Sequence, residues 1–402
     1  MKILMLTPYV PYPPSSGGQI RTYNLLKYLS KTNEITLVVL YKNENEKKYY
    51  KPLEKYCKNI YLCKRAEKPW QINNIFKTLF SFNPFLIIRN YSEQAKKIVT
   101  KLLKTEEFDV IHAETFYIMP HIPKTNIPVL LVEQTIEYKV YKHYILSFPK
   151  IVQLLFYLDI VKLKYWERYY WRKANLVATV SGADEKIIKN HEPDINTCIV
   201  PNGAGDEMIA ETLKVKDLKK PIVFFQGNFY WLQNVEAAKY LISKIYPKLI
   251  KTLPNIRIII SGQNAKKIEK YNKKGLEIIN ISPDDINTVK KYFLESSLFI
   301  APIFGPGGTR LKILAAMASG TPVISTKVGT EGLDVEDNKN VLIANNSNEF
   351  VEKIKNILNN KKRYEEIRKN AYDLVRKKYN WVSIAQTLEI VYEKLKKNEN
   401  RN

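Results

Sequence analysis

Short apolar segments rich in β-branched residues recur along the first half of the chain, and stretches with helical spacing separate them. Gln19–Ser30, which follows the Pro/Gly-rich loop Pro8–Gly18, has the period of a helix. The apolar segments are Lys2–Thr7, Glu34–Tyr41, Phe108–His112, Pro128–Glu133 and Leu176–Val180. Runs of this length without strict alternation are typical of strands that are buried on both faces of a sheet. Strands that alternate with helices predict a parallel sheet with right-handed crossovers.

The second half of the chain begins the same pattern again. Its predicted strands are Pro221–Gln226, Ile256–Ser261, Leu276–Ile279, Leu298–Ala301 and Pro322–Ser325. A long helix is expected over Val235–Leu253, and Trp381–Lys397 has amphipathic helical spacing. Asp206–Lys220 is charged and has no strand signal, so we interpret it as the connector. We therefore predict an α/β fold of two doubly wound Rossmann-like domains, residues 1–205 and 206–380, with strand ends that face each other across a cleft.

The segment from Phe304 to Gly332 carries the clearest chemical signal. A predicted strand, Ser297–Pro302, enters a glycine-rich turn, and a predicted helix, Arg310–Ser319, leaves it. Such a turn directs backbone N–H groups and the positive end of a helix dipole toward a ligand. With two cations on the first helical turn, the expected ligand is a phosphate or diphosphate. The candidate residues are Gly307, Gly308, Thr309, Arg310 and Lys312. An ordinary strand–helix connection would also contain glycines.

Two further glycine turns follow the first predicted strand of each half. Gly17 and Gly18 allow the backbone to approach a ligand closely, although PYPPSSGG also fits a rigid surface loop. Arg21, on the first turn of the helix that follows, is expected to face outward, toward solvent or an anion. Gly227 and Asn228 form the second turn. The aromatic residues after it, Phe229, Tyr230 and Trp231, fit either stacking on a base or sugar or burial in the core.

Acidic and imidazole side chains lie at two predicted strand ends in the first half. His112 ends one strand and Glu114 follows it, while Glu133 ends the next and Glu137 follows four residues later. Carboxylates gathered there can orient sugar hydroxyls, act as a base or stabilise developing positive charge. A structural histidine is the alternative for His112. The sequence contains no arrangement typical of a nucleophile–His–Asp triad or a metal site.

Composition narrows the class of partner. The 402 residues include 64 Lys and Arg against 40 Asp and Glu, a formal charge of +24. This surplus favours anionic partners, although a general bias toward Lys, Ile and Asn would also produce it. No motif points to nucleic acid. Cys57, Cys63 and Cys198 lack metal-ligand spacing and fit a reducing compartment. No run is long enough for a spanning helix, so we expect a cytoplasmic protein that at most lies on a membrane.

Two stretches combine aromatic and basic residues. The first, Trp70–Tyr91, contains Phe76, Phe80 and Phe82 together with Lys77. The second, Tyr144–Lys173, mixes apolar, aromatic and basic side chains over a length that suits one long helix. This blend is typical of helices at an anionic membrane surface. The alternative, which we favour for the second stretch, is that the aromatic side chains bury against the first sheet.

With these features in order, the chain resembles the family 4 retaining glycosyltransferases of the two-Rossmann-domain (GT-B) type over nearly its full length. It is most similar to a branch with a GGTRLKILEAMA-like segment, which Gly307–Ala318 matches except at one position. The other matching motifs are Ser15–Gly18, Phe108–Glu114, Val180-Ser181, Pro201–Gly203, Gly227-Asn228, Ser319–Thr326 and Gly329–Leu333.

The resemblance implies a nucleotide-diphosphate sugar bound by the C-terminal domain and a saccharide or lipid-linked acceptor on the N-terminal domain. It also implies that a C-terminal helix, residues 381–402, packs back on the N-terminal domain. Transfer would retain the anomeric configuration with no cofactor and no obligatory metal. Arg310 and Lys312 would stabilise the leaving diphosphate, Gly17 and Gly18 would lie near the donor, and His112 and Glu114 would line the sugar end.

Two departures from the family pattern leave alternatives open. Ala315 replaces a glutamate that this branch retains, and Glu331 in the following loop is a candidate substitute. Glu114 stands where many members have a histidine, with His112 two residues earlier. Besides a transferase that builds cell-surface polysaccharide or glycolipid, the sequence therefore allows a non-catalytic sugar-nucleotide-binding or scaffolding subunit. A GT-B-type epimerase fits the motifs less well.

Overall fold

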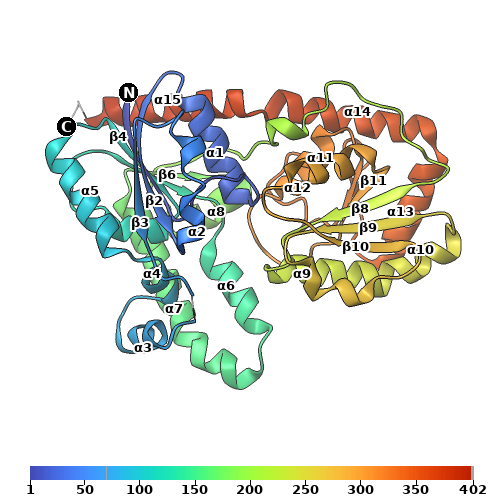
Figure 1. Ribbon diagram of the computed structural model, residues 1–402, viewed down its shortest axis with the longest axis horizontal. Coiled ribbons are helices and arrows are strands. Elements are labelled where there is room, and N and C mark those ends of the chain that lie inside the picture. Colours follow the sequence, from blue (N-terminus) through green and yellow to red (C-terminus); the bar gives the residue numbers. More distant parts are fainter. Residues whose placement is uncertain (69, 400–402) are drawn as a thin grey trace. The chain divides into compact units, whose positions relative to one another are not determined.

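The computed structural model describes residues 1–68 and 70–399, and the chain divides into two α/β units (Figure 1). The first unit contains Met1–Pro14, Gly18–Pro201 and the chain from Ile384 on. The second contains Ser15–Gly17 and Asn202–Ser383. Both units are built on a parallel sheet, as the alternation of strands and helices predicts.

In the described residues, the sheet of the first unit has seven strands in the order β3-β2-β1-β4-β5-β6-β7. The strands are β1 Lys2–Thr7, β2 Glu34–Tyr41, β3 Asn59–Lys64, β4 Val110–Glu114, β5 Val129–Glu133, β6 Leu176–Thr179 and β7 Thr197–Ile199. All five residues of β4 and of β5 are buried, as apolar central strands require. Strand β4 extends two residues beyond the predicted end, so Glu114 lies within it.

Helices connect these strands, and one further helix of the first unit comes from the C-terminal end of the chain. They are α1 Gly17–Leu29, α2 Glu44–Lys47, α3 Ile72–Phe80, α4 Phe85–Asn90, α5 Glu93–Thr105, α6 Glu137–Leu146, α7 Lys150–Lys173, α8 Gly182–His191 and the C-terminal α15 Trp381–Glu399. The order of strands reverses direction between β1 and β4. Because parallel crossovers are right-handed, this reversal puts helices on both faces of the sheet.

The second unit repeats the plan with six strands in its described part, in the order β10-β9-β8-β11-β12-β13. The strands are β8 Ile222–Gln226, β9 Arg257–Gly262, β10 Leu276–Asn280, β11 Leu298–Ala301, β12 Val323–Ser325 and β13 Leu342–Ile343. The helices are α9 Leu232–Tyr240, α10 Tyr246–Thr252, α11 Ile286–Glu295, α12 Leu311–Ala318, α13 Ser347–Asn359 and α14 Lys361–Lys378.

The long helix expected over Val235–Leu253 is interrupted in the middle. A π-helical turn, Leu241–Ile245, separates α9 from α10. Pro247 lies in the first turn of α10 and has no N–H to donate to the carbonyl four residues back. The wider turn before this proline accommodates the missing hydrogen bond.

Helix α15 belongs to the first unit from Ile384 on (Figure 1). The hydroxyl of Tyr392 is 2.6 Å from Nδ1 of His112 on β4, and Lys396 forms an ion pair with Asp109 at 2.7 Å. Glu389 accepts hydrogen bonds from Thr32 and Asn33. Residues 400–402 of the predicted helix lie outside the described residues.

Each sheet has one point where the strand order reverses, between β1 and β4 in the first unit and between β8 and β11 in the second. Ligands of open α/β sheets bind beyond the carboxyl ends of the strands at such points. A candidate site is therefore expected in the loops that leave β1 and β4 in the first unit, and another in the loops that leave β8 and β11 in the second.

Candidate active site

Gly227, directly after β8, and Gly262, the last residue of β9, bring their backbones unusually close together. A Cβ on Gly262 would overlap the carbonyl oxygen of Gly227, and a Cβ on Gly227 would lie 2.9 Å from Cγ of Asn234. Gly262 has a φ of +144°, which disfavours other residues. Packing alone therefore requires glycine at both positions, whether or not a ligand binds there.

Asn228 and Asn234 fix the shape of the turn after β8. Oδ1 of Asn228 accepts from the N–H of Tyr230 at 2.9 Å and from Nδ2 of Asn264 at 2.8 Å. Nδ2 of Asn234 donates to the carbonyl of Asn228 at 2.8 Å. Of the neighbouring aromatic residues, Phe229 is buried, whereas Tyr230 and Trp231 are 58% and 50% exposed. The exposed pair keeps the predicted ability to stack on a ligand.

The glycine-rich turn after β11 wraps around the guanidinium of Arg310. Nη1 of Arg310 donates to the carbonyl of Gly308 at 3.0 Å, and Nη2 donates to that of Gly305 at 2.8 Å. Gly307 has a φ of +150°, and a Cβ there would collide with Nη1 of Arg310. Gly308 and Thr309 lead from this turn to the N-terminus of α12. The turn therefore holds Arg310 at the positive end of a helix.

Lys312 lies on the first turn of α12 and is half-buried. Its Nζ donates to Oδ1 of Asn234 at 2.6 Å and lies 5.0 Å from the ring centre of Phe225. Burial, with a smaller contribution from the charge of Arg310, lowers the pKa of Lys312 to about 7. Two cations with this little hydration favour an anionic ligand that can share them. Sequence reasoning missed Asn234, because an asparagine on a helix gives no signal of a partner 78 residues away.

Ala315 and Glu331 complete the candidates of the second unit. Ala315 is half-buried on α12 and packs against the core. Glu331 lies in the loop after β12, and its side chain is exposed. That Glu331 takes over the ribose contact of the glutamate replaced by Ala315 stays a prediction.

Arg21 corrects a prediction. Instead of facing outward, its side chain has no exposed surface. Nη1 of Arg21 donates to the carbonyls of Val200 and Pro201 at 3.1 and 3.0 Å, and Nε is 3.7 Å from Oε1 of Glu114. The first turn of α1 packs at the carboxyl end of the sheet, so a long cation there is buried and needs partners that the local sequence does not reveal.

Glu114 is the centre of a buried polar network at the reversal point of the first sheet. Nε2 of His112 is 3.0 Å from its Oε1, and Nε2 of Gln134 donates to its Oε2 at 2.5 Å. Burial raises the pKa of Glu114, but the hydrogen bond of His112 and the charges of His112 and Arg21 outweigh it and leave the pKa below its ordinary value. Glu114 is therefore ionised at neutral pH.

The side chains around this network reach the surface only in part. His112 and Glu114 have no exposed surface, while Tyr9 and Gln134 are half-buried. Nε2 of Gln134 donates to the Tyr9 hydroxyl at 2.9 Å. A Cβ on Gly18 would lie 2.7 Å from the Tyr9 ring, so the glycine makes room for it. Gly17, the first residue of α1, is grouped with the second unit.

The carboxylate of Glu133 and the backbone N–H of Glu137 have structural partners. Oε1 of Glu133 accepts from the indole N–H of Trp171 at 2.8 Å. Glu167 accepts from the backbone N–H groups of Glu137 and Tyr138 at 2.7 and 3.1 Å, so it caps α6. Burial, with the charge of Glu167, raises the pKa of Glu133, and burial raises that of Glu137 to about 7.

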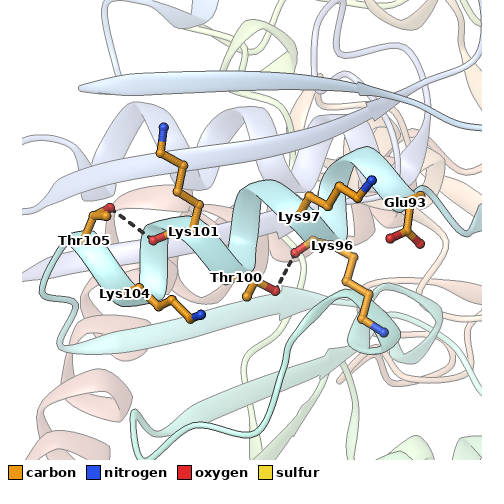
Figure 2. A pocket seen from close by; sticks show the side chains of 7 residues that line it. All are labelled: Glu93, Lys96, Lys97, Thr100, Lys101, Lys104 and Thr105. Carbon is orange, nitrogen blue, oxygen red and sulfur yellow. Dashed lines mark hydrogen bonds between the residues drawn. The ribbon is translucent and has the colours of Figure 1, made fainter.

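A surface recess along α5 contains none of the predicted site residues. It is lined by Glu93, Lys96, Lys97, Thr100, Lys101, Lys104 and Thr105 (Figure 2). Its threonines donate to carbonyls of the same helix, Thr100 to Lys96 at 2.8 Å and Thr105 to Lys101 at 3.1 Å (Figure 2).

Across the described residues, no helix is both long and apolar enough to span a membrane.

Comparison with known proteins identifies the architecture. The chain is similar to the structure of sucrose-phosphate synthase from Thermosynechococcus elongatus, with 15% identity, a TM-score of 0.71, and coverage of 98% of this chain and 99% of the other. It is also similar to Anabaena HepE in complex with UDP-glucose, with 15% identity, a TM-score of 0.64, and coverage of 98% and 100%. The fold is GT-B. The predicted fold class, two doubly wound Rossmann-like domains, is confirmed.

Sequence comparisons agree with the GT-B assignment. Residues 220–360 match the family model described as "Glycosyl transferases group 1". An uncharacterized 44.6 kDa protein in the cps region of Klebsiella pneumoniae is 24% identical over 94% of this chain and 96% of its own length. An uncharacterized glycosyltransferase of Methanocaldococcus jannaschii is 25% identical over 98% of this chain and 99% of its own length. Together these findings support a GT-B glycosyltransferase.

Proposed function

We propose that this GT-B protein moves a sugar from a nucleotide-diphosphate donor to a saccharide or lipid-linked acceptor in cell-surface polysaccharide or glycolipid synthesis. The proposal includes retention of the anomeric configuration, a family 4 mechanism without an obligatory metal or cofactor, and a cytoplasmic setting at the inner face of the membrane. The observation that carries it is the position of Arg310 and Lys312 at the reversal point of the second sheet.

Charge development in the reaction explains why two cations are needed. As the bond from the anomeric carbon to the diphosphate oxygen breaks, negative charge accumulates on the leaving diphosphate. Arg310 and Lys312, with the N–H groups of the turn from Gly307 to Thr309, stabilise that charge and are already held in place before substrate binds. The nucleoside lies near Gly227, Asn228 and Glu331 in this proposal, and Tyr230 and Trp231 offer exposed rings beside that turn.

The network of the first unit has a positioning role in this proposal. Because His112 and Glu114 are fully buried, they act on the substrate through the half-buried Gln134 and Tyr9. Gly17 and Gly18 begin α1 at the point where the order of the first sheet reverses. In this proposal they lie close to the donor and the acceptor. In this proposal the acceptor binds the predicted N-terminal domain, residues 1–205, and the donor binds the predicted C-terminal domain, residues 206–380.

Titration calorimetry with UDP-, GDP- and ADP-sugars tests the donor site. A native-state ligand should also raise the melting temperature. Loss of a charge-assisted hydrogen bond costs roughly 1.5–3 kcal/mol, so Arg310→Ala should weaken donor binding about 10- to 100-fold. Arg363→Ala removes an arginine of α14 in the same unit, whose side chain is 41% exposed, and should leave affinity unchanged. Equal effects of the two substitutions, or no binding of any nucleotide sugar, would reject the proposed site.

A second candidate function, a non-catalytic sugar-nucleotide-binding subunit, is favoured by Ala315 alone. Both functions predict donor binding, so turnover must separate them. We expect wild-type protein to hydrolyse or transfer the sugar of its donor at a measurable rate and Ala315→Glu to change that rate. If wild-type protein binds donor without turnover, and Ala315→Glu creates activity, the non-catalytic function is correct.

A further inference from the structure

Helix α3 presents the wrong face to solvent for a protein surrounded by water. The two residues that it buries are polar, Asn74 and Thr78, each 7% exposed. Its large apolar side chains point outward, with exposures of 73% for Ile72, 56% for Phe76 and 85% for Phe80. An amphipathic helix on a globular protein has the opposite arrangement. The outer face of α3 therefore needs an apolar environment that the residues described by the structure do not supply.

The first half of α7 has the same character. Ile151, Leu154, Leu155 and Leu158 are 68%, 70%, 66% and 68% exposed. The second half differs, because Leu163 and Trp171 are fully buried. The expectation that the aromatic side chains of Tyr144–Lys173 bury against the sheet is thus correct for Trp171 and wrong for Tyr157 and Tyr165, which are exposed.

The two helices form one surface. Nζ of Lys162 on α7 donates to the carbonyls of Thr78 and Ser81 at 2.8 and 2.7 Å, which satisfies the C-terminal end of α3. The indole N–H of Trp166 donates to the carbonyl of Phe82 at 2.9 Å. Figure 1 shows α3 beside α7. We call this surface the α3–α7 patch, and it consists of Ile72, Phe76, Leu79, Phe80, Phe82, Ile151, Leu154, Leu155 and Leu158.

Aromatic side chains with polar edges accompany the patch. Trp70 is 44% exposed and packs its ring 4.8 Å from that of Phe85 and 5.7 Å from that of Phe156. Tyr157 and Tyr165 are 62% and 45% exposed. Tryptophan and tyrosine prefer the boundary between apolar and aqueous phases. Exposed apolar surface on this scale marks an interaction site.

Charge decides which partner fits the patch. The sequence has no acidic residue from Lys68 to Asn90, and Asp159 is the one acid from Tyr138 to Trp166. Asp159 is 5% exposed and accepts from the N–H of Phe85 at 2.9 Å, so it does not face the partner. Lys77, Lys139, Lys142 and Lys150 are exposed in these segments. A second copy would oppose like charges across the contact, whereas an anionic lipid surface pairs with them.

We propose that the α3–α7 patch is an interfacial anchor that inserts into the boundary between headgroups and acyl chains of an anionic bilayer. The apolar side chains provide binding by burial, and the lysines provide attraction to the headgroups. The anchor goes beyond sugar transfer, because no residue of the donor site takes part in it. A lipid-linked acceptor would meet the first unit at the same membrane.

Vesicle cosedimentation of the full chain tests the anchor without nucleotide. Wild-type protein should bind phosphatidylglycerol vesicles more tightly than phosphatidylcholine vesicles and should keep part of its binding at high salt, since burial is not screened. The patch variant Phe76→Ser/Phe80→Ser/Leu154→Ser/Leu158→Ser should bind at least about tenfold more weakly. The matched control, Val215→Ser/Ile390→Ser, removes apolar side chains that are 86% and 54% exposed elsewhere and should bind as wild type does.

Tryptophan quenching by brominated lipids locates the contact. Quenching in wild-type protein should fall in Trp70→Phe, because Trp70 borders the patch. Equal vesicle binding by the patch variant and wild type, or no binding by wild type, would overturn the anchor. A wild-type dimer that the patch variant abolishes, without vesicle binding, would assign the patch to a second copy instead. Donor affinity of the patch variant should equal that of wild type, so a failed anchor and a failed donor site give different results.

Discussion

Lys312 is the residue whose protonation links the donor site to pH. Its pKa of about 7 means that free protein loses this charge as pH rises through neutrality. A bound diphosphate favours the protonated form, so binding takes up a proton above pH 7. We expect the affinity for a nucleotide-diphosphate sugar to fall by up to about tenfold per pH unit above pH 7, since one proton is coupled to binding. Calorimetry in buffers of different ionisation enthalpy measures both the affinity and the proton uptake.

Two controls fix the sign of this effect. The arginine of the Lys312→Arg variant stays charged above pH 7, so the affinity of this variant for the nucleotide-diphosphate sugar should not change with pH. The stability of free protein should change with pH in the opposite direction to the donor affinity. The reason is that Lys312 keeps its proton to about pH 10 in the unfolded chain but loses it near pH 7 in the folded chain. Unfolding free energy of wild type relative to Lys312→Met should therefore rise with pH between about 7 and 10. A donor affinity of wild-type protein that does not change with pH would show that binding is not coupled to protonation of Lys312.

Gly307 supports Arg310 through its missing side chain. Gly307→Ala places a Cβ against the guanidinium of Arg310 at a φ of +150°. Strain of roughly 1–3 kcal/mol and displacement of Arg310 should follow. We expect weaker donor binding, measured by calorimetry, and a lower unfolding free energy in urea. Gly205→Ala is the matched control, because its φ is −60° and the added Cβ meets the flexible side chain of Glu207. If both variants bind alike, the conformation of this turn does not set donor affinity.

At the scale of elements, Glu114 ties β4 to α1 and, through His112, to α15. Glu114→Ala leaves the buried Arg21 without its carboxylate, which costs about 3–5 kcal/mol for a broken buried ion pair. Tyr392→Phe removes one neutral hydrogen bond and should cost about 1 kcal/mol. Urea unfolding of wild-type protein and of the two variants measures both losses of unfolding free energy. Similar losses for both would mean that charge pairing contributes little to this network.

Elements were predictable where their pattern is local. Every predicted strand has a counterpart, because strands buried on both faces are continuous apolar runs. The turn around Arg310 was also visible, since glycines and cations lie within a few residues. Arg21, Asn234 and Tyr392 were not, because their partners come from distant segments that only the folded chain brings together. The π-helical turn before Pro247 and the outward face of α3 likewise depend on what each helix packs against.

At the scale of the whole molecule, the first unit depends on a segment that follows the second unit in the sequence. The part of α15 that belongs to the first unit buries Ile384, Leu388, Tyr392 and Leu395, none more than 6% exposed. Each such side chain contributes roughly 1.5–3 kcal/mol on burial. Their sum is comparable with the free energy of unfolding of a typical folded protein, which is about 5–15 kcal/mol. A chain that ends at Ser383 should therefore lose the first unit and keep the second.

Hydrogen exchange resolves the two units separately. In the chain that ends at Ser383, amides of β1 and β4 should exchange at the rate of an unfolded chain, while those of β8 and β11 should stay protected. Single substitutions on α15 give the matched comparison. Leu388→Ser puts a polar group into a site with no exposure and should lower the stability of the first unit alone, whereas Ile390→Ser, at a position 54% exposed, should change neither unit. Protection of β1 and β4 in the shortened chain would mean that the first sheet and its own helices form a sufficient core without α15.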